Sequence, residues 1–181
     1  IPSYNEEANI ERTAQTIGQV LSDAQIEYEL LFVSDGSKDK TYELVCELSQ
    51  KDSRIKGLQF SRNFGKEATI FAGMSLIKGD CCAVIDCDLQ HPPETLVEMY
   101  RLWEEGYDVI EGIKSNRGKE GIMHKMFVGI FYGIMSSLMK LDMNATSDFK
   151  LMDRKVVDVL LSLPEKNTFF RALTFWTGFK S

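Results

Sequence analysis

The chain has 181 residues, of which 44% are hydrophobic and 27% are charged, and its formal net charge is −6. This is the composition of a soluble globular domain with a core of its own, and the negative charge argues against a nucleic-acid-binding protein. Its four cysteines, at positions 46, 81, 82 and 87, form no Cys-x-x-Cys pair. We therefore expect small core residues in a reducing compartment rather than disulfides or a zinc site.

The start of the chain, Ile1-Pro2 without a methionine, leads us to expect a fragment of a longer protein. We expect neither a signal peptide nor a membrane-spanning segment within it.

Short apolar strands and amphipathic helices alternate along the first 111 residues. After a strand that ends near Pro2, the pattern predicts strands at 29–33, 56–61, 81–85 and 107–111. It predicts helices at 10–21, 39–48 and 70–77 and from Glu94 onward, the second of them capped by Asp39. This alternation predicts an α/β fold, a mainly parallel sheet with helices on both faces.

The strand at 81–85 delivers two carboxylates, Asp86 and Asp88, and Pro92-Pro93 then prevent the strand from continuing. Carboxylate oxygens at the carboxyl end of a buried strand are ligands for a hard divalent cation such as Mg²⁺, together with phosphate oxygens of a substrate. The alternative is that both residues only cap the helix that follows.

Three other polar loops also follow predicted strands: Tyr4-Asn5-Glu6, Asp35-Gly36-Ser37 and Arg62-Asn63-Phe64-Gly65-Lys66. In parallel sheets, ligands bind beyond the carboxyl ends of the strands. Four such loops therefore predict one site that handles phosphate through a metal. The sequence has no Gly-x-Gly-x-x-Gly or Walker loop, which argues against a dinucleotide-dependent dehydrogenase and a P-loop NTPase.

Taken in order, these loops resemble those of the family 2 inverting glycosyltransferases, which have the GT-A fold. The matching stretches are Pro2-x-Tyr4-Asn5-Glu6-Glu7, Asp35-Gly36-Ser37-x-Asp39-x-Thr41, Asn63-x-Gly65-Lys66 and Asp86-x-Asp88-x-Gln90-x-Pro92. The subgroup most similar is the polyprenyl-phosphate glycosyltransferases, which include bactoprenol glucosyltransferases and dolichol-phosphate mannose synthases.

A further stretch, Asp148-Phe149-Lys150-Leu151-Met152-x-Arg154, resembles the acceptor-side motif of that subgroup. It departs from the usual motif in having Lys150 where Arg is common, and Ser34 stands where many members have a second Asp. The resemblance covers the chain from Ile1 to about Arg171.

The resemblance implies roles for particular residues. Pro2, Tyr4, Glu6 and Asp35 would hold the nucleobase and ribose, with help from Asp86. Asp88 would bind Mg²⁺ or Mn²⁺ across the diphosphate, with Asp86 and Gln90 in the same metal site. Contacts to the sugar or the acceptor would come from Asn63, Lys66, Arg117, Lys150 and Arg154.

Asp148 is the candidate for the catalytic group beside the nucleophile, because inversion needs one in-line nucleophile with a base near it. A lipid phosphate acceptor is already ionised near neutral pH, so Asp148 would then orient the acceptor more than remove a proton. The alternative is that Asp148 only caps a turn before Phe149.

The stretch that follows the fifth strand is basic and then strongly apolar. Its basic residues are Lys114, Arg117, Lys119 and Lys125, and no charged residue occurs between Lys125 and Lys140. The apolar run is too short to span a bilayer, so it predicts a core helix, a helix at a membrane surface or a contact face between two copies of the chain. The neighbouring cations favour a membrane surface carrying lipid phosphate.

The sequence thus leads to one hypothesis and several alternatives. The hypothesis is a metal-dependent inverting glycosyltransferase that moves a sugar from a nucleotide-sugar to a polyprenyl phosphate at the cytoplasmic face of the cell membrane. Residues 1–113 would bind donor and metal, and residues 114–181 would face the acceptor within the same domain. The alternatives are a saccharide hydroxyl as acceptor, a phosphatase of the haloacid dehalogenase type, and a nucleotide-sugar-binding module without activity.

Overall fold

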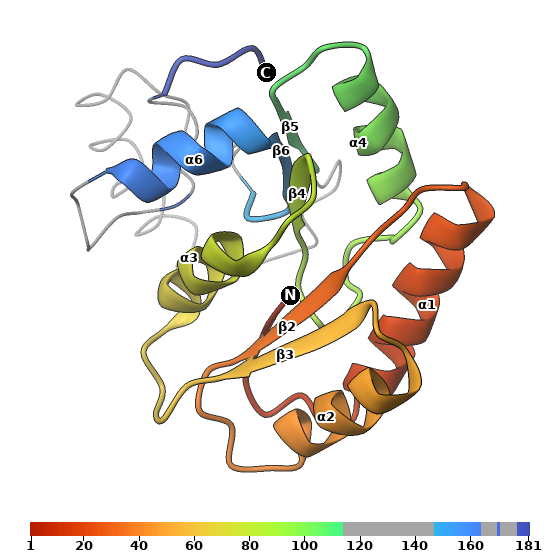
Figure 1. The fold of residues 1–181 in the computed structure, drawn as a ribbon, viewed down its shortest axis with the longest axis vertical. Helices are drawn as coiled ribbons and strands as arrows, with labels where there is room; N and C mark the ends of the chain where they lie inside the picture. Colours follow the sequence, from red (N-terminus) through yellow and green to blue (C-terminus); the bar gives the residue numbers. More distant parts are fainter. Residues whose placement is uncertain (114–146, 164–169, 171–176) are drawn as a thin grey trace, which may run out of the picture.

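The computed structural model describes residues 1–113, 147–163, 170 and 177–181, and Figure 1 shows the arrangement of their elements. The strands are β1 (Pro2–Ser3), β2 (Leu30–Ser34), β3 (Ile55–Gln59), β4 (Cys81–Val84), β5 (Val109–Glu111) and β6 (Lys150–Asp153). The helices are α1 (Ile10–Asp23), α2 (Thr41–Lys51), α3 (Lys66–Leu76), α4 (Thr95–Glu104) and α6 (Arg154–Ser162).

The first three strands form a parallel sheet in the order β1-β2-β3. In its register Val33 lies opposite Pro2, and Leu30 lies opposite Ile55. Every residue of β2 is buried, which is typical of a strand covered on both faces and explains its unbroken apolar sequence. The polar loops after β1 and β2 consequently leave the same edge of this sheet.

The other three strands form a second sheet in the order β4-β6-β5, with β6 antiparallel to both of its neighbours. The predicted α/β fold with helices on both faces is confirmed, but β6 was not predicted. Lys150 lies within this four-residue strand, and a charged residue there interrupts the apolar pattern that would have revealed it. Because β6 lies between β4 and β5, it completes a sheet that began in the first half of the chain.

Helices cover both faces of the sheets. In Figure 1, α1, α2 and α4 lie on the right and α3 and α6 lie on the left. One buried cluster joins α1, α2 and α4 to β2, β3 and the strands of the second sheet. Another joins α3 and α6 to β4, β5 and β6. Neighbouring residues of β6 divide between them, Leu151 in the first and Met152 in the second, as the period of two in a strand requires.

Several boundaries differ from the predicted ones; α3, for example, begins at Lys66 rather than at 70, and β3 ends at Gln59 rather than at 61. Strand β4 ends at Val84, so Ile85 already belongs to the loop that carries Asp86. Strand β5 begins at Val109 rather than at 107, and the N–H groups of Asp108 and Val109 donate to the carbonyl of Lys180 near the end of the chain.

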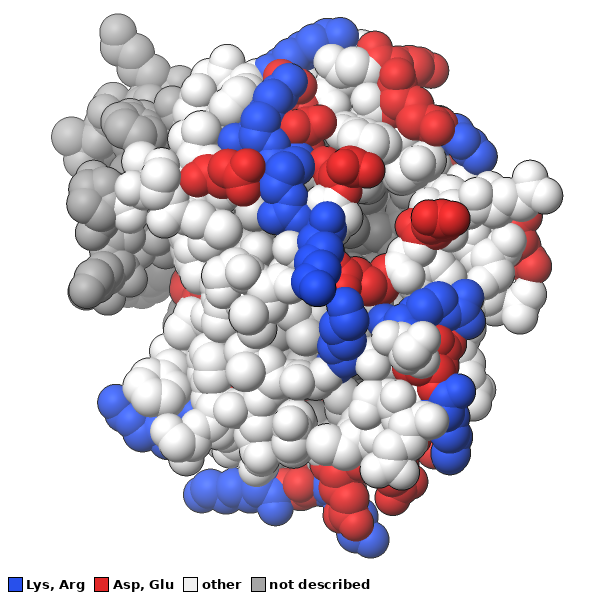
Figure 2. Space-filling view, in the orientation of Figure 1, with Lys and Arg blue, Asp and Glu red and all other residues white. Residues whose placement is uncertain are grey.

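Within the part of the chain described here, every helix is too short or too polar to cross a bilayer. The basic residues Lys114, Arg117, Lys119 and Lys125 and the apolar stretch 122–139 lie outside the described residues. On the face shown in Figure 2, basic and acidic side chains lie beside one another across the middle of the molecule. Among the described residues, ion pairs join Lys56 to Glu29 and Lys155 to Asp108.

Candidate functional site

A cleft of about 380 Å³ lies at the carboxyl ends of β1, β2 and β4. Its walls contain most of the residues that the sequence singled out: Pro2, Tyr4, Glu6, Asp35, Asn63, Lys66, Asp86 and Asp88. A larger cavity of about 760 Å³ has walls from β2, β4, α3 and α4, but of the candidate residues that the structure describes it contains only Pro2. The polar cleft is therefore the candidate site.

The loop after β1 is tied to the loop before α2. The N–H of Glu6 donates to Thr41 Oγ1 at 2.7 Å, and the N–H of Glu7 donates to Asp39 Oδ2 at 3.1 Å. Asp39 Oδ1 also accepts the N–H of Thr41 at 3.0 Å, but the N-cap of α2 is Lys40, so the predicted cap lies one residue too early. The bonds fix the backbone of this wall, while the side chain of Tyr4 is 44% exposed at the cleft.

Asp35 holds the loop between β3 and α3. Its side chain is buried, and its two oxygens accept the N–H groups of Phe64 at 2.7 Å and Gly65 at 2.9 Å. Next to it, Gly36 has a φ of 65°, and a Cβ there would lie 2.4 Å from the carbonyl carbon of Arg62. Because each carboxylate oxygen has two lone pairs, Asp35 keeps the capacity to accept a ribose hydroxyl while it holds this loop.

Lys66, the first residue of α3, connects two of the candidate carboxylates. Its Nζ lies 2.7 Å from Oδ1 and 3.0 Å from Oδ2 of Asp86, and 3.0 Å from Oδ2 of Asp148. Burial lowers the pKa of Lys66, but the hydrogen bonds and charges of Asp86 and Asp148 outweigh it and raise the pKa above its ordinary value. The ammonium group therefore stays charged in the cleft near neutral pH.

A hydrogen bond from helix α1 holds the Asp86–Asp88 loop in place. Thr13 on α1 is fully buried, and its Oγ1 donates to the carbonyl of Cys87 at 2.6 Å. Beyond it, Leu89 has a φ of 54°, and Asp88 Oδ1 accepts the N–H of Gln90 at 3.0 Å. These contacts leave the Asp88 side chain exposed at the mouth of the cleft.

The donor set fits a hard divalent cation only in part. Among the described residues, no group of three His, Cys, Asp or Glu side chains could hold a metal ion by itself. Asp86 and Asp88 supply oxygen ligands, and Mg²⁺ is commonly bound by one or two carboxylates plus the phosphates of a substrate. The pair therefore fits a metal that arrives with a diphosphate.

Asp148 is placed by the residue after it. The ring of Phe149, which is buried, lies against the ring of His91 with centroids 4.7 Å apart. The N–H of Gly112 donates to the carbonyl of Phe149 at 2.9 Å. His91 follows the Asp86–Asp88 loop and Gly112 follows β5, so Phe149 joins three segments at this edge of the second sheet.

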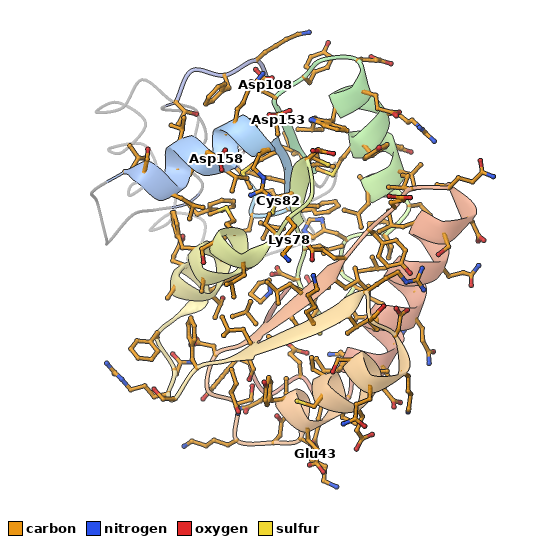
Figure 3. All side chains as sticks on the ribbon, in the orientation of Figure 1. Glu43, Lys78, Cys82, Asp108, Asp153 and Asp158 are labelled. Carbon is orange, nitrogen blue, oxygen red and sulfur yellow. The ribbon has the colours of Figure 1, made fainter. Side chains whose placement is uncertain are left out.

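Two candidate acceptor contacts lie elsewhere. Lys150 is fully buried and forms an ion pair with Glu111, and its Nζ lies 5.8 Å from the centre of the Phe170 ring. The guanidinium of Arg154 donates to the carbonyls of Ile77 and Gly79 before β4. Asp153 and Asp108, labelled in Figure 3, mark this opposite edge of the second sheet, so the structure does not bring Arg154 to the cleft.

Sequence reasoning did not identify Thr13 or His91 as parts of the site. Thr13 lies on the apolar face of α1, where a single hydroxyl among aliphatic residues was the only available signal. His91 lies between two of the matching motif positions, Gln90 and Pro92, but is not itself one of them. Of the predicted contacts, Arg117 lies outside the described residues.

Comparison with known proteins identifies a family that matches most of the chain. The family described as Glycosyl transferase family 2 matches residues 1–161. An uncharacterized glycosyltransferase of Bacillus subtilis, YkcC, is 45% identical over 181 residues, which are 99% of this chain and 56% of that protein. The bactoprenol glucosyl transferase of Shigella phage SfV is 34% identical over 180 residues, 98% of this chain and 58% of that protein. The chain thus spans a little over half the length of these relatives.

Solved structures share the fold at low sequence identity. The mannosyltransferase PcManGT from Pyrobaculum calidifontis, in complex with GDP-Man and Mn²⁺, has a TM-score of 0.66 and 14% identity, over 99% of this chain and 51% of that one. TarS of S. aureus has a TM-score of 0.61 and 20% identity, over 95% and 51% of the two chains. The GT-A fold expected from the sequence is confirmed by these neighbours.

Proposed function

Since the chain belongs to glycosyl transferase family 2, we propose that it transfers a sugar from a nucleotide-sugar to a polyprenyl phosphate, with inversion at the anomeric carbon and with a divalent cation. The observation that carries this proposal is the meeting of Asp86, Lys66 and Asp148 at one end of the cleft. Metal-binding, cationic and acceptor-side groups are the three parts that such a reaction needs.

The donor would bind along the first half of the chain. Tyr4 and Glu6 line the part of the cleft that would take the nucleoside, and Asp35 is close enough to share it. Asp86 and Asp88 would hold Mg²⁺ or Mn²⁺, and the ammonium of Lys66 would contact the diphosphate. When bound, such a cation stabilises the negative charge that develops on the leaving diphosphate.

The acceptor would approach from the side of Asp148, within residues 114–181. A phosphate oxygen of the acceptor would form a bond to the anomeric carbon while the bond from that carbon to the diphosphate oxygen breaks, and the electron pair leaves with the nucleoside diphosphate. Because the acceptor oxygen is already ionised, Asp148 would orient it rather than remove a proton. Its 12% exposed side chain limits contact with water at this point.

A polyprenyl phosphate is favoured as acceptor by the 34% identity to a bactoprenol glucosyl transferase over nearly the whole chain. A lipid acceptor would place the protein at the cytoplasmic face of the cell membrane, where nucleotide-sugars are available. The basic residues Lys114 to Lys125 and the apolar stretch after them would then face the membrane.

The test is transfer of labelled sugar by the purified protein from a panel of UDP-sugars and GDP-sugars to undecaprenyl phosphate, with Mg²⁺ or Mn²⁺. Asp88→Asn should reduce transfer on the order of 100-fold or more without unfolding the protein, because it removes a metal ligand at constant volume. Asp158→Asn is the matched control, since Asp158 is exposed on α6, away from the cleft (Figure 3). Full activity of a folded Asp88→Asn variant would refute the metal assignment.

The same assay separates the alternatives. Transfer to a saccharide hydroxyl but not to undecaprenyl phosphate would replace the proposed acceptor. Binding of nucleotide-sugar with no transfer to either acceptor would indicate a binding module. The configuration of the product at the anomeric carbon, read from its NMR coupling constant, tests inversion.

A further inference from the structure

Lys66 Nζ lies within 3.0 Å of both carboxylate oxygens of Asp86, a proposed metal ligand. We propose that Lys66 neutralises Asp86 and Asp148 while the donor is absent, and that it exchanges these partners for the donor diphosphate when a divalent cation binds Asp86. The inference rests on the proposed function and adds to it an exchange of ionic partners by Lys66.

The contacts of Asp86 are the first step of the argument. Both of its carboxylate oxygens lie within 3.0 Å of Lys66 Nζ. A divalent cation on either oxygen would lie close to the ammonium, and two positive charges at such a separation in a partly buried cleft repel strongly. Asp86 therefore cannot keep the full contact with Lys66 and bind a metal at the same time.

Asp88 differs from Asp86 in this respect. It accepts a backbone N–H from Gln90, and among the described residues no ammonium or guanidinium group forms an ion pair with it. Of the two proposed metal ligands, Asp88 is thus accessible, whereas Asp86 is already neutralised by Lys66. Metal alone should bind weakly, because two carboxylates with one of them paired make a poor site.

The structure of Lys66 allows the exchange. Its backbone is fixed at the start of α3, because Gly65 before it donates to Asp35. Its long side chain is 40% exposed and lines the cleft, so only the side chain needs to turn. A diphosphate offers the ammonium several charged oxygens, and such charge-assisted hydrogen bonds are stronger than neutral ones.

The exchange would also act on Asp148. While Lys66 lies 3.0 Å from Asp148 Oδ2, that carboxylate is neutralised and its oxygen is occupied. Movement of Lys66 to the diphosphate would end this contact with Oδ2 of Asp148. Donor binding would in this way prepare the acceptor side, through a single side chain that contacts both.

The experiment measures Mn²⁺ affinity, by electron paramagnetic resonance or calorimetry, on the purified protein alone and with UDP or GDP. Lys66→Met and Lys66→Gln should both bind Mn²⁺ about tenfold tighter than the parent in the absence of nucleotide, because the competing charge is gone. Lys66→Arg, which keeps the charge, should bind Mn²⁺ as weakly as the parent. The factor by which nucleotide improves Mn²⁺ binding should be smaller in Lys66→Met than in the parent.

The double variant Lys66→Met/Asp86→Asn is the control, since it should lose the gain if the gain depends on Asp86. Unchanged or weaker Mn²⁺ binding by folded Lys66→Met and Lys66→Gln, with normal Mn²⁺ binding by the parent in the presence of nucleotide, would overturn the exchange alone. A parent protein that binds no Mn²⁺ even with UDP or GDP would instead refute the metal site of the proposed function, and the exchange with it.

Discussion

Gly112 lies so close to the ring of Phe149 that a Cβ at position 112 would come within 2.1 Å of Cδ1 of that ring. The two residues are also joined by the hydrogen bond from the Gly112 N–H to the Phe149 carbonyl. Phe149 therefore occupies a place that only a glycine at 112 leaves open. Asp148, the residue before Phe149, depends on this placement.

Gly112→Ala should destabilise the protein by about 1–3 kcal/mol, the usual cost of overpacking a core. Transfer should fall as well, because a displaced Phe149 moves Asp148. Urea unfolding and the transfer assay measure the two effects. Gly73→Ala is a suitable control, since its Cβ would meet only Val33 Cγ2 at 3.3 Å and the substitution favours helix α3. Equal stability of the two variants would contradict the close packing at Gly112.

His91 should matter through its ring. His91→Ala removes the contact with Phe149 and should lower kcat more than it raises the KM for the nucleotide-sugar, because Phe149 places the acceptor-side Asp148. His91→Phe keeps an aromatic ring and should restore most of kcat, since such a ring pair contributes about 0.5–1.5 kcal/mol. If His91→Phe were as impaired as His91→Ala, the imidazole itself would be needed and the packing role would be wrong.

Thr13→Val should cost roughly 1–3 kcal/mol of stability, because it leaves the buried carbonyl of Cys87 without its hydrogen bond. The same helix offers a matched control in Thr16, whose Oγ1 donates to the carbonyl of Arg12 within α1 and is exposed. Thr16→Val should therefore have little effect. The measurement is urea unfolding of both variants, and a comparable small loss in each would show that the Cys87 contact is unimportant.

The sequence predicted the walls of the cleft well, because the polar loops follow strands. Carboxyl ends of parallel strands meet at one edge, so Tyr4, Asp35 and Asp86 are expected to converge once the strands are recognised. The predicted roles of these residues in binding and catalysis are a separate matter and stay predictions.

The sequence could not show which groups touch across the cleft. Lys66 and Asp148 are 82 positions apart, and their contact exists because β6 runs between β4 and β5 in the direction opposite to both. That strand was hidden by Lys150, whose charge pairs with Glu111 on the neighbouring strand. A pairing between strands cannot be read from the residues of one strand alone.

The free energy of unfolding of the protein should depend on pH through the carboxyl group of Asp39. Burial raises the pKa of Asp39, but hydrogen bonds from Thr41 and from the Glu7 N–H outweigh it and hold the pKa below its usual value. A carboxyl whose pKa is lower in the folded state contributes stability that is present above its unfolded pKa, near 4, and is lost as the pH falls through the folded value.

Asp39→Ala should thus cost about 1 kcal/mol at pH 7, the typical net value of a hydrogen bond, and less near pH 3. Asp39→Asn keeps a neutral hydrogen-bond acceptor, so its stability at pH 7 should lie between those of the parent and Asp39→Ala. Urea unfolding at several pH values tests this, and a loss that stayed constant down to pH 3 would show that the charge of Asp39 contributes nothing.

The buried pair of Lys150 and Glu111 allows the two possible roles of Lys150 to be separated. Lys150→Met leaves a carboxylate that is only 10% exposed without its cation, and such a change costs about 3–5 kcal/mol. The double variant Lys150→Met/Glu111→Leu removes both charges and should recover most of this loss, because an apolar pair of similar size packs well there.

Transfer activity of the double variant then decides the role. If Lys150 only holds β6 against β5, the double variant should regain both stability and transfer, and its KM for the acceptor should match that of the parent. If Lys150 contacts the acceptor, as its position in the acceptor-side motif led us to expect, stability should return while transfer stays low. We expect the first result, because a fully buried side chain that already pairs with Glu111 and lies near the Phe170 ring has no route to a ligand in the cleft without breaking that pair.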